Sequence, residues 1–266
     1  MKNPPKLVLF SDLDGTLLDH ETYAWKPAQS ALKRLAALRI PVVLTSSKTA
    51  CEMKVLQDDM GLGHWPAIVE NGAGVIGLPD ANPVETYSDL RKALDRLPRE
   101  LRQAFHGFGD MTVEEISTLT GLPKEAAQRA KARGYSEPGI WSGSDKALAK
   151  FTSALAEESL MAQHGGRFLT LSFGQTKADA MQTVIDALHA EITLALGDAP
   201  NDFAMLENAD MGVIVANRHR PTPPLLRGEK EGRIIRTDAP GPAGWNDAVH
   251  GILDRLGFAE GQTLNG

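Results

Sequence analysis

The chain has 266 residues, of which 42% are hydrophobic and 23% charged, and its formal net charge is −6. This composition is typical of a globular chain with one large domain or two smaller ones, and the negative charge argues against nucleic acid or an anionic membrane as a partner. No apolar run approaches the roughly 18 residues of a membrane span. The single cysteine, Cys51, excludes an internal disulfide. With little chain before the first predicted strand to hold a signal peptide, we expect a cytoplasmic protein.

Strand and helix patterns alternate through the first 70 residues. Short apolar runs predict strands, apolar residues at helical spacing predict helices, and Pro27 is suited to the first turn of a helix. The expected elements are a strand at 7–10, a helix from 27 to 38, a strand at 40–44, a helix at 48–60 and a strand at 67–69. This βαβαβ order predicts a parallel sheet with helices on its faces.

The middle of the chain, from about Pro79 to Gly174, is more polar. It begins with the turn-rich stretch Pro79-Asp80-Ala81-Asn82-Pro83. The patterns there predict helices at 87–97 and 124–133 and short strands at 139–142 and 167–172. We expect a second α/β unit, inserted into the first and closing over its site like a lid. The predicted division is a core of residues 1–82 and 174–266 and a cap of residues 83–173.

The alternation resumes after Lys177. We expect a helix through Leu188, a strand at 192–196, a short helix at 200–207 and a strand at 212–215. No Gly-x-Gly-x-x-Gly follows any of the predicted strands, so a dinucleotide site is unsupported. The stretch from Asn217 to Trp245 is predicted as a long loop around one short strand at 233–236. Such a loop belongs either to a functional surface or to the periphery, and both interpretations stay open.

The first predicted strand runs directly into Asp12-Leu13-Asp14-Gly15-Thr16. Alternate side chains of an extended segment point the same way, so Asp12 and Asp14 can address one small volume. One carboxylate can attack phosphorus while the other handles the proton of the leaving group. A second acidic stretch, Gly197-Asp198-Ala199-Pro200-Asn201-Asp202, follows another strand. Two strand ends that deliver carboxylates predict a Mg²⁺ site with oxygen ligands.

These motifs resemble those of haloacid dehalogenase superfamily phosphatases, and the resemblance covers nearly the whole chain. It implies a Rossmann-like parallel α/β core with an inserted α/β cap of the superfamily's IIB type. It further implies that Asp12 is the nucleophile, that Asp14 is the general acid and base, and that Mg²⁺ is the cofactor. The residues implied to hold the metal are Asp12, Asp14, Asp198 and Asp202, and those implied to hold the phosphoryl group are Ser46, Ser47, Lys177 and Asn201.

Several of these residues also have an ordinary structural interpretation. Ser46 and Ser47 end one predicted strand before a helix, where they can bind phosphate with the free backbone N–H groups or cap the helix. Lys177 at a helix start is either a phosphoryl-binding point charge or a solvated surface residue. Its neighbours Thr176 and Ala178 depart from the Asp-Lys-Gly of the related phosphatases. Asp202 either binds the metal or orients water, and Asn71 either contacts substrate or forms the turn into the cap.

The cap carries a narrower resemblance. Ala132-Arg133-Gly134-Tyr135-Ser136-Glu137-Pro138 and Gly165-Gly166-Arg167-Phe168 are similar to segments of mannosyl-3-phosphoglycerate phosphatases, as are Ser46-Ser47-Lys48-Thr49 and Gly241-Pro242-Ala243-Gly244-Trp245. A glycerate carboxylate suits an arginine fork, so Arg133 and Arg167 are candidates, with surface ion pairs as the alternative. Glu137 is a candidate acceptor for sugar hydroxyls. Gly134 stands where the related phosphatases usually have an acidic residue between Arg and Tyr. This difference indicates that the end of the substrate pocket that holds the sugar has changed.

The resemblance implies hydrolysis of mannosyl-3-phosphoglycerate to the compatible solute mannosylglycerate, through an aspartyl-phosphate. The expected partner is a small phosphorylated glycosylglycerate, with no nucleic acid and no membrane. Three alternatives stay open: a glucosyl-3-phosphoglycerate or other sugar-phosphate phosphatase, a phosphomutase of the same superfamily, and an inactive binding protein on this fold. Fold alone does not decide between them.

Overall fold

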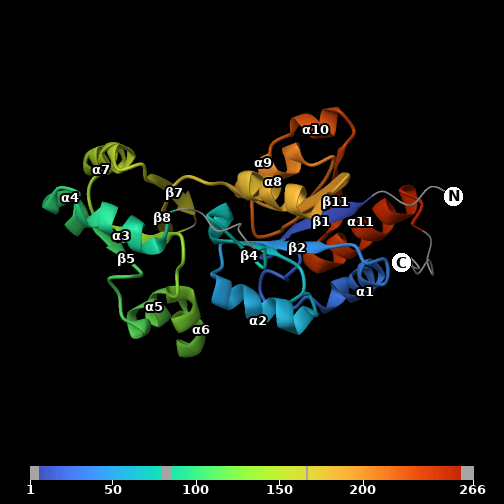
Figure 1. The fold of residues 1–266 in the computed structure, drawn as a ribbon, viewed down its shortest axis with the longest axis horizontal. Coiled ribbons are helices and arrows are strands. Elements are labelled where there is room, and N and C mark those ends of the chain that lie inside the picture. The colour runs from blue at the N-terminus through green and yellow to red at the C-terminus, as the bar shows by residue number, and fades with distance from the viewer. Residues whose placement is uncertain (1–5, 79–84, 166, 259–266) are drawn as a thin grey trace. The chain divides into compact units, whose positions relative to one another are not determined.

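The computed structural model of the chain describes residues 6–78, 85–165 and 167–258 (Figure 1). The chain forms two compact units. Unit 1 is built from the segments up to Ser46, Leu62–Ile68 and from Lys177 onward, and unit 2 from Ser47–Gly61 and Val69–Thr176. The predicted boundary at 82/83, the turn at 79–83 and Gly166 lie outside the described residues, so the division into 1–82, 83–173 and 174–266 stays a prediction.

The larger sheet has the strand order β11-β10-β9-β1-β2-β3-β4. The pairs β1–β2, β1–β9, β9–β10, β10–β11 and β2–β3 are all parallel, which confirms the predicted parallel α/β core. Strand β1 is buried over its full length, as expected for a central strand of a parallel sheet. The strands of this sheet are β1 (Leu7–Asp12), β2 (Val42–Thr45), β3 (Ala67–Val69), β4 (Gly74–Ile76), β9 (Ile192–Gly197), β10 (Met211–Ala216) and β11 (Ile234–Pro240).

Helices cover both faces of the parallel strands of unit 1. In Figure 1, α8 and α9 lie on one face, and α1 and α11 lie side by side on the other. Ser30 of α1 donates a hydrogen bond to Asn246 of α11 across 2.7 Å, which ties this pair together. The helices and 3₁₀ turns of unit 1 are η1 (Lys26–Ala28), α1 (Gln29–Ala37), α8 (Lys177–Leu188), η3 (Pro200–Asp202), α9 (Phe203–Asn208), α10 (Arg227–Lys230) and α11 (Gly241–Arg255).

Unit 2 contains a four-stranded sheet in the order β5-β6-β8-β7, and its strands are antiparallel to their neighbours. The strands are β5 (Phe105–Gly107), β6 (Glu137–Trp141), β7 (Met161–Gly165) and β8 (Phe168–Ser172). The helices and the 3₁₀ turn are α2 (Ala50–Met60), η2 (Glu70–Gly72), α3 (Tyr87–Asp95), α4 (Arg99–Ala104), α5 (Val113–Thr120), α6 (Lys124–Lys131) and α7 (Asp145–Glu157).

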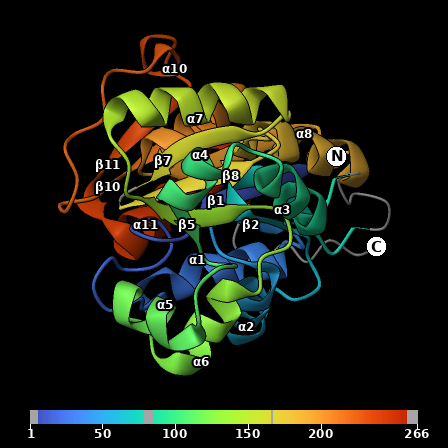
Figure 2. The ribbon, with the colours of Figure 1, turned by 90° about the vertical axis from the view of Figure 1, so that its left-hand side faces the viewer.

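Two hydrophobic clusters hold the small sheet between helices. Leu90 of α3 and Phe151 of α7 pack with Leu169 and Leu171 of β8 in one cluster. In the other, Ile116 of α5 and residues of α6 pack with Phe168, the neighbour of Leu169 on β8. Adjacent residues of a strand point to opposite faces, so the two clusters occupy opposite faces of the sheet. Figure 2 shows the same arrangement, with α7 on one side and α5 and α6 on the other.

The strands β4, β5 and β7 and the helices α4, α5 and α7 were not predicted from the sequence, and three predicted segments differ for a local reason. The helix predicted to open at Pro27 begins with a 3₁₀ turn at Lys26–Ala28, and its α-helical part starts at Gln29. The helix predicted from residue 48 begins at Ala50, because Thr49 and Glu52 form a capping box there. The predicted long loop contains α10 and β11, and it ends where α11 begins at Gly241. Gly241 and Pro242 look like a turn but occupy the first helical turn, where proline is tolerated. None of the helices in the described ranges is long and apolar enough to cross a bilayer.

Candidate active site

The strand order of unit 1 brings several polar residues to one edge of the sheet. Asp12 ends β1 beside its register partner Thr45 of β2, and Asp198 directly follows β9 on the other side of β1. The carboxyl ends of parallel strands meet at the same edge, which is where ligands of open α/β sheets bind. Both acidic motifs of the sequence therefore come together, as their positions after strands predicted.

Lys177 lies at the centre of this group. As the first residue of α8, it is 1% exposed. Its Nζ donates to Asp12 Oδ1 across 2.6 Å and to Asp202 Oδ1 across 2.7 Å, and it also lies 3.5 Å from the carbonyl oxygen of Thr45. A buried ammonium group needs such partners, because desolvation of a lone charge is costly. Lys177 is thus an interior residue in contact with Asp12, whatever its role toward substrate.

Burial and charge shift the pKa values of this pair. Burial, followed by the nearby charge of Asp202, raises the pKa of Asp12 from 3.8 to about 6. Burial by itself lowers the pKa of Lys177, but the carboxylates of Asp12 and Asp202 outweigh it and raise that pKa above its ordinary value. Lys177 therefore carries a fixed positive charge at neutral pH. A preorganised cation at this position suits the charge of a phosphoryl group in transfer.

Asp12, Asp198 and Asp202 form a group of buried carboxylates with the chemistry of a metal site. One oxygen of each lies within 4.8 Å of the others, and no other His, Cys, Asp or Glu group in the described ranges meets this criterion. Three hard oxygen donors fit a divalent cation such as Mg²⁺. Asp202 Oδ2 also accepts hydrogen bonds from the backbone N–H groups of Asp198 and Ala199, both across 3.1 Å. Asp202 thus positions the turn that carries Asp198, and its direct ligation stays a prediction.

The turn after Asp12 needs a glycine. Asp14 forms a single bridge with Leu18, and Gly15 has a φ of +88°, which side-chain-bearing residues rarely adopt. A Cβ on Gly15 would lie 2.4 Å from Asn217 Nδ2 and 2.9 Å from Asp198 Oδ2. The close packing around Gly15 thus brings the DxDGT turn against the carboxylate of Asp198, while the proton-transfer role of Asp14 stays a prediction.

Three residues around Asp198 escaped the sequence analysis. Thr16 Oγ1 donates to Asp198 Oδ1 across 3.2 Å, and Asn217 Nδ2 donates to Asp198 Oδ2 across 2.6 Å. The Nε of Arg220 lies 3.4 Å from the same Oδ2. Burial and the charge of Asp12 raise the pKa of Asp198, and the hydrogen bond from Asn217 opposes that rise. Thr16 lies inside the DxDGT motif after β1, and Asn217 directly follows β10. Their positions just after strands could have predicted that both residues lie near Asp198.

The other predicted phosphate-binding residues lie close to strand ends. Ser46 directly follows β2 and is 1% exposed, and Asn201 lies in the 3₁₀ turn after β9. Ser47 is exposed and belongs to unit 2. The cap of α2 is Thr49 and neither serine. Contact of Ser46, Ser47 and Asn201 with phosphate stays a prediction.

Arg133 of unit 2 is engaged inside the protein. Its side chain is 6% exposed, and its guanidinium donates to the carbonyl oxygen of Ser47 across 3.2 Å and to Ser136 Oγ across 2.6 Å. Its Nε lies 3.3 Å from Glu70 Oε2. A guanidinium in these contacts orders the loop around it. Binding of a substrate carboxylate by Arg133, which stays a prediction, would have to use the donors that remain or replace these contacts.

Glu137 is buried in a network of charged side chains within unit 2. It has 0% exposure, and it accepts hydrogen bonds from Arg91 Nη1 across 2.9 Å and from Gly109 N across 2.7 Å, and a very short one from the Tyr87 hydroxyl. Arg91 also donates to Asp110, across 2.5 Å. These contacts assign Glu137 a structural role that the sequence did not reveal, and its predicted role toward sugar hydroxyls stays a prediction.

Arg167 and Asn71 complete the predicted substrate-binding set, both in unit 2. Arg167 is exposed, donates through Nη1 to the carbonyl oxygen of Leu119 across 2.6 Å, and lies 5.7 Å above the ring of Phe168. Asn71 lies in the turn after β3 with a φ of +61°. Both interpretations of Asn71 thus stay open.

The fold and the site fit one class of protein, the phosphoryl-transfer enzymes, with a cluster of buried carboxylates at the carboxyl edge of a parallel sheet. Comparison with known proteins agrees. A family model described as haloacid dehalogenase-like hydrolase matches residues 6–210. A curated relative, the glucosyl-3-phosphoglycerate/mannosyl-3-phosphoglycerate phosphatase of Persephonella marina, is 35% identical over 272 aligned residues, covering 94% of this chain and 98% of that protein.

Solved structures show the same fold. The sucrose-phosphatase of Synechocystis sp. PCC6803, solved with sucrose and phosphate, superposes with a TM-score of 0.61 at 16% identity, covering 95% of this chain and 98% of that one. The subclass IIB sugar phosphatase BT4131 superposes with a TM-score of 0.59 at 14% identity, covering 95% and 99%. The chain therefore belongs to the haloacid dehalogenase-like hydrolases, and it is a phosphoric monoester hydrolase. The predicted family, fold class and enzyme class are confirmed.

Proposed function

We propose that this enzyme hydrolyses mannosyl-3-phosphoglycerate to mannosylglycerate and phosphate through an aspartyl-phosphate on Asp12. The observation that carries the proposal is the buried contact of Asp12 with Lys177, 2.6 Å long, at the strand end that also presents Asp198. A carboxylate nucleophile with a fixed cation beside it suits attack on an anionic phosphorus centre.

The reaction divides into two displacements. A carboxylate oxygen of Asp12 attacks phosphorus, the bond from phosphorus to the ester oxygen breaks, and Asp14 gives a proton to that oxygen. Asp14 then takes a proton from water, whose oxygen attacks the phosphorus of the aspartyl-phosphate and releases phosphate from Asp12. Lys177 with Ser46, Ser47 and Asn201 would hold the phosphoryl oxygens through both steps.

A Mg²⁺ ion fits the buried carboxylates of the site. Asp12 and Asp198 would hold it, with Asp14 and Asp202 as the further predicted ligands, and the ion would neutralise charge on the phosphoryl oxygens. The negatively charged cluster of Asp12, Asp198 and Asp202, with ligand oxygens within 4.8 Å of one another, supports a cation there.

The name of the relative from Persephonella marina supports mannosyl-3-phosphoglycerate as the proposed substrate. Its name specifies both the mannosyl and the glucosyl substrate, so glucosyl-3-phosphoglycerate is the second candidate for this chain. Of the two candidate arginines for the glycerate carboxylate, Arg167 is exposed whereas the side chain of Arg133 is 6% exposed, so we favour Arg167. We further propose that the enzyme acts in the cytoplasm in the biosynthesis of mannosylglycerate as a compatible solute. The single cysteine is consistent with a reducing compartment.

Phosphate release across a panel of substrates tests the proposal. We expect kcat/KM for mannosyl- or glucosyl-3-phosphoglycerate to exceed that for hexose 6-phosphates by about tenfold to a hundredfold, because a charged hydrogen bond to the glycerate carboxylate contributes about 1.5–3 kcal/mol. Chelation of Mg²⁺ should abolish turnover, and so should Asp12→Asn, whereas Asp186→Asn on an exposed position of α8 serves as the control. If the enzyme prefers plain hexose phosphates, the proposed substrate is wrong. If Asp12→Asn keeps full activity, Asp12 is not the nucleophile.

A further inference from the structure

Two buried hydrogen bonds in series connect α11 to the strand end that carries Asp12. The indole Nε1 of Trp245 donates to Ser11 Oγ across 2.9 Å, and Ser11 Oγ donates to the carbonyl oxygen of Asp12 across 2.7 Å. Ser11 and Trp245 are both 0% exposed, and all three residues belong to unit 1. The two displacements proposed above use neither Ser11 nor Trp245.

The end of β1 is held from both faces of the sheet. Ser11 and Asp12 point to opposite faces, because adjacent side chains of a strand alternate. Helices α8 and α11 also lie on opposite faces (Figure 1). Lys177 of α8 contacts the carboxylate of Asp12, whereas Trp245 of α11 contacts Ser11. Asp12 is therefore held through its side chain from one face and through its main chain from the other.

The indole determines the direction in which the Ser11 hydroxyl donates. A serine hydroxyl has one proton and two acceptor lone pairs, and it rotates to suit its partners. An indole N–H is only a donor, so Trp245 occupies a lone pair of Ser11 Oγ and leaves the proton for the carbonyl oxygen of Asp12. Two hydrogen bonds in series strengthen each other in a buried region. Loss of either donor should therefore loosen the main chain of Asp12.

The sequence around Trp245 keeps the start of α11 close to β11. A Cβ on Gly244 would overlap the carbonyl oxygen of Ala239, so a side chain there would push the helix away from the strand. The close approach places the next residue, Trp245, with its indole on Ser11. The Gly244-Trp245 pair thus has a structural use that depends on both residues.

We propose that Trp245 and Ser11 are positioning residues that hold the main chain of Asp12 for its attack on phosphorus. This assignment rests on the proposed role of Asp12 as nucleophile and goes beyond it by naming residues that set the geometry of the attack. Both side chains are fully buried, so they act through Asp12 and not on substrate. Misplacement of a reacting atom by about 1 Å can cost about a hundredfold in rate. The restraint should therefore affect the rate of attack more than the binding of substrate.

Single-turnover hydrolysis measures the attack itself. With enzyme in excess over the phosphate monoester that it cleaves fastest, the rate of ester cleavage at saturation reports the first displacement without product release. Ser11→Ala removes the hydroxyl, and Trp245→Phe removes the indole N–H but keeps a ring. Each should lower this rate by about three- to tenfold, as for the loss of one hydrogen bond, and change the half-saturating concentration by less than about twofold. The double variant should be about as slow as the slower single variant, because both changes break the same series of contacts.

The matched control for Ser11→Ala removes a buried hydroxyl elsewhere in the same sheet. Thr193 Oγ1 of β9 donates to Asp210 Oδ2 across 2.7 Å and accepts from Asp210 N across 2.9 Å, so it makes one bond of each kind, as Ser11 does. Its register partner on β1 is Val8, which lies before the strand end that carries Asp12. Thr193→Val should lower the urea midpoint but keep the single-turnover rate within about twofold of wild type, because it removes a hydrogen bond that does not reach Asp12.

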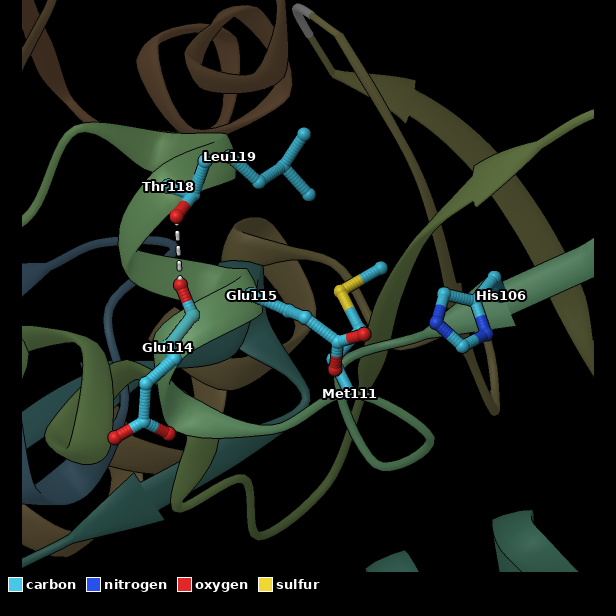
Figure 3. A pocket seen from close by; sticks show the side chains of 6 residues that line it. All are labelled: His106, Met111, Glu114, Glu115, Thr118 and Leu119. Carbon is cyan, nitrogen blue, oxygen red and sulfur yellow. Dashed lines mark hydrogen bonds between the residues drawn. The ribbon is translucent and has the colours of Figure 1, made fainter.

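Two variants in unit 2 serve as further controls. Trp141→Phe is matched to Trp245→Phe, since Trp141 Nε1 is buried and has no hydrogen-bond partner among the described residues. Thr118→Val removes an exposed hydroxyl that donates to the carbonyl oxygen of Glu114 in α5, a hydrogen bond that Figure 3 shows. Both variants should keep the wild-type single-turnover rate.

The outcomes separate this inference from the proposed function. If Ser11→Ala and Trp245→Phe keep the wild-type rate, or if Thr193→Val slows it equally, the two residues are only structural and the inference is wrong. Trp245→Phe leaves space in the core, so the smaller change in Ser11→Ala decides if the phenylalanine variant does not fold. An inactive Asp12→Asn beside such results leaves the proposed function standing. Full activity of Asp12→Asn refutes the nucleophile, and this inference fails with it.

Discussion

At the scale of single residues, the charge balance of the site depends on Lys177. One buried ammonium group contacts two buried carboxylates, Asp12 and Asp202, across 2.6 and 2.7 Å. Removal of a partner from a buried ion pair leaves an uncompensated charge, which costs more than the pair itself contributes. We therefore expect the ammonium group that we propose to hold the phosphoryl group to stabilise the folded site as well.

Lys177→Met tests this double role. We expect the variant to lose activity and to unfold at a lower urea concentration, with a loss of about 3–5 kcal/mol, because Asp12 and Asp202 are left buried and unpaired. Urea unfolding followed by circular dichroism measures the second effect. Lys54→Met on α2 is the control, since its ammonium is exposed and lies 3.5 Å from Asp58 on the surface. Equal midpoints for Lys177→Met and wild type would contradict a stabilising role for the buried ion pair.

At the scale of elements, the turn after β3 holds the loop before β6. Glu70, 2% exposed, accepts hydrogen bonds from Gly134 N across 2.7 Å, from Tyr135 N across 3.1 Å and from Ser136 Oγ across 2.7 Å. Its backbone has a φ of +53°, uncommon for a glutamate. A side chain that satisfies three donors of one loop explains why this strained conformation persists.

Glu70→Ala should release this loop. Three donors lose their acceptor, so we expect a loss of about 1–3 kcal/mol in stability and faster hydrogen exchange at the amides of Gly134 and Tyr135. Glu70→Gln, which keeps an acceptor oxygen, should recover part of the protection. Exchange at the amides of α7 is the internal reference. Unchanged exchange at Gly134 in Glu70→Ala would show that the loop is held by other contacts.

The half-buried ion pairs of Asp110 with Arg91 and Arg102 in unit 2 predict a pH effect. Burial by itself raises the pKa of Asp110, but hydrogen bonds from Arg102 and Arg91 outweigh it and hold that pKa well below its usual range. A lowered pKa in the folded state stabilises the protein above the unfolded-state pKa of about 3.9, and this stability is lost as pH falls further. Asp110→Asn should therefore be less stable than wild type at pH 7 and should lose less stability between pH 4 and pH 2.

Urea midpoints at these pH values measure the effect. The control is Asp95→Asn, because Asp95 also pairs with Arg102 but its side chain is 60% exposed, where an ion pair contributes little. If Asp110→Asn and wild type lose the same stability in acid, Asp110 is not the group whose protonation matters.

At the scale of the whole molecule, the sequence predicted the parallel core better than unit 2. Asp12 and Asp198 follow neighbouring parallel strands, whose carboxyl ends lie at the same edge of the sheet. An acidic motif directly after a predicted strand therefore predicts a residue at that edge. No pattern in the sequence indicated that Glu137 would be buried, because its partners Tyr87, Arg91 and Gly109 lie far from it in the chain. Nor did it reveal α11, whose opening Gly241 and Pro242 resemble a turn. Tertiary contacts decided both cases.

The last prediction concerns the stability of the whole protein with its metal. A ligand that binds only the folded state stabilises it by mass action, by about 2.7 kcal/mol at a hundred times its Kd. Asp198 is a ligand of the proposed Mg²⁺ site, and Asn217 orients its carboxylate with a 2.6 Å hydrogen bond. Addition of Mg²⁺ should therefore raise the Tm of wild type, raise that of Asn217→Ala less, and leave that of Asp198→Asn nearly unchanged. Calorimetric Mg²⁺ titration should rank the three proteins in the same order. Arg218→Ala, next to Asn217 in the chain, should respond as wild type does, and an undiminished response of Asp198→Asn would place the metal elsewhere.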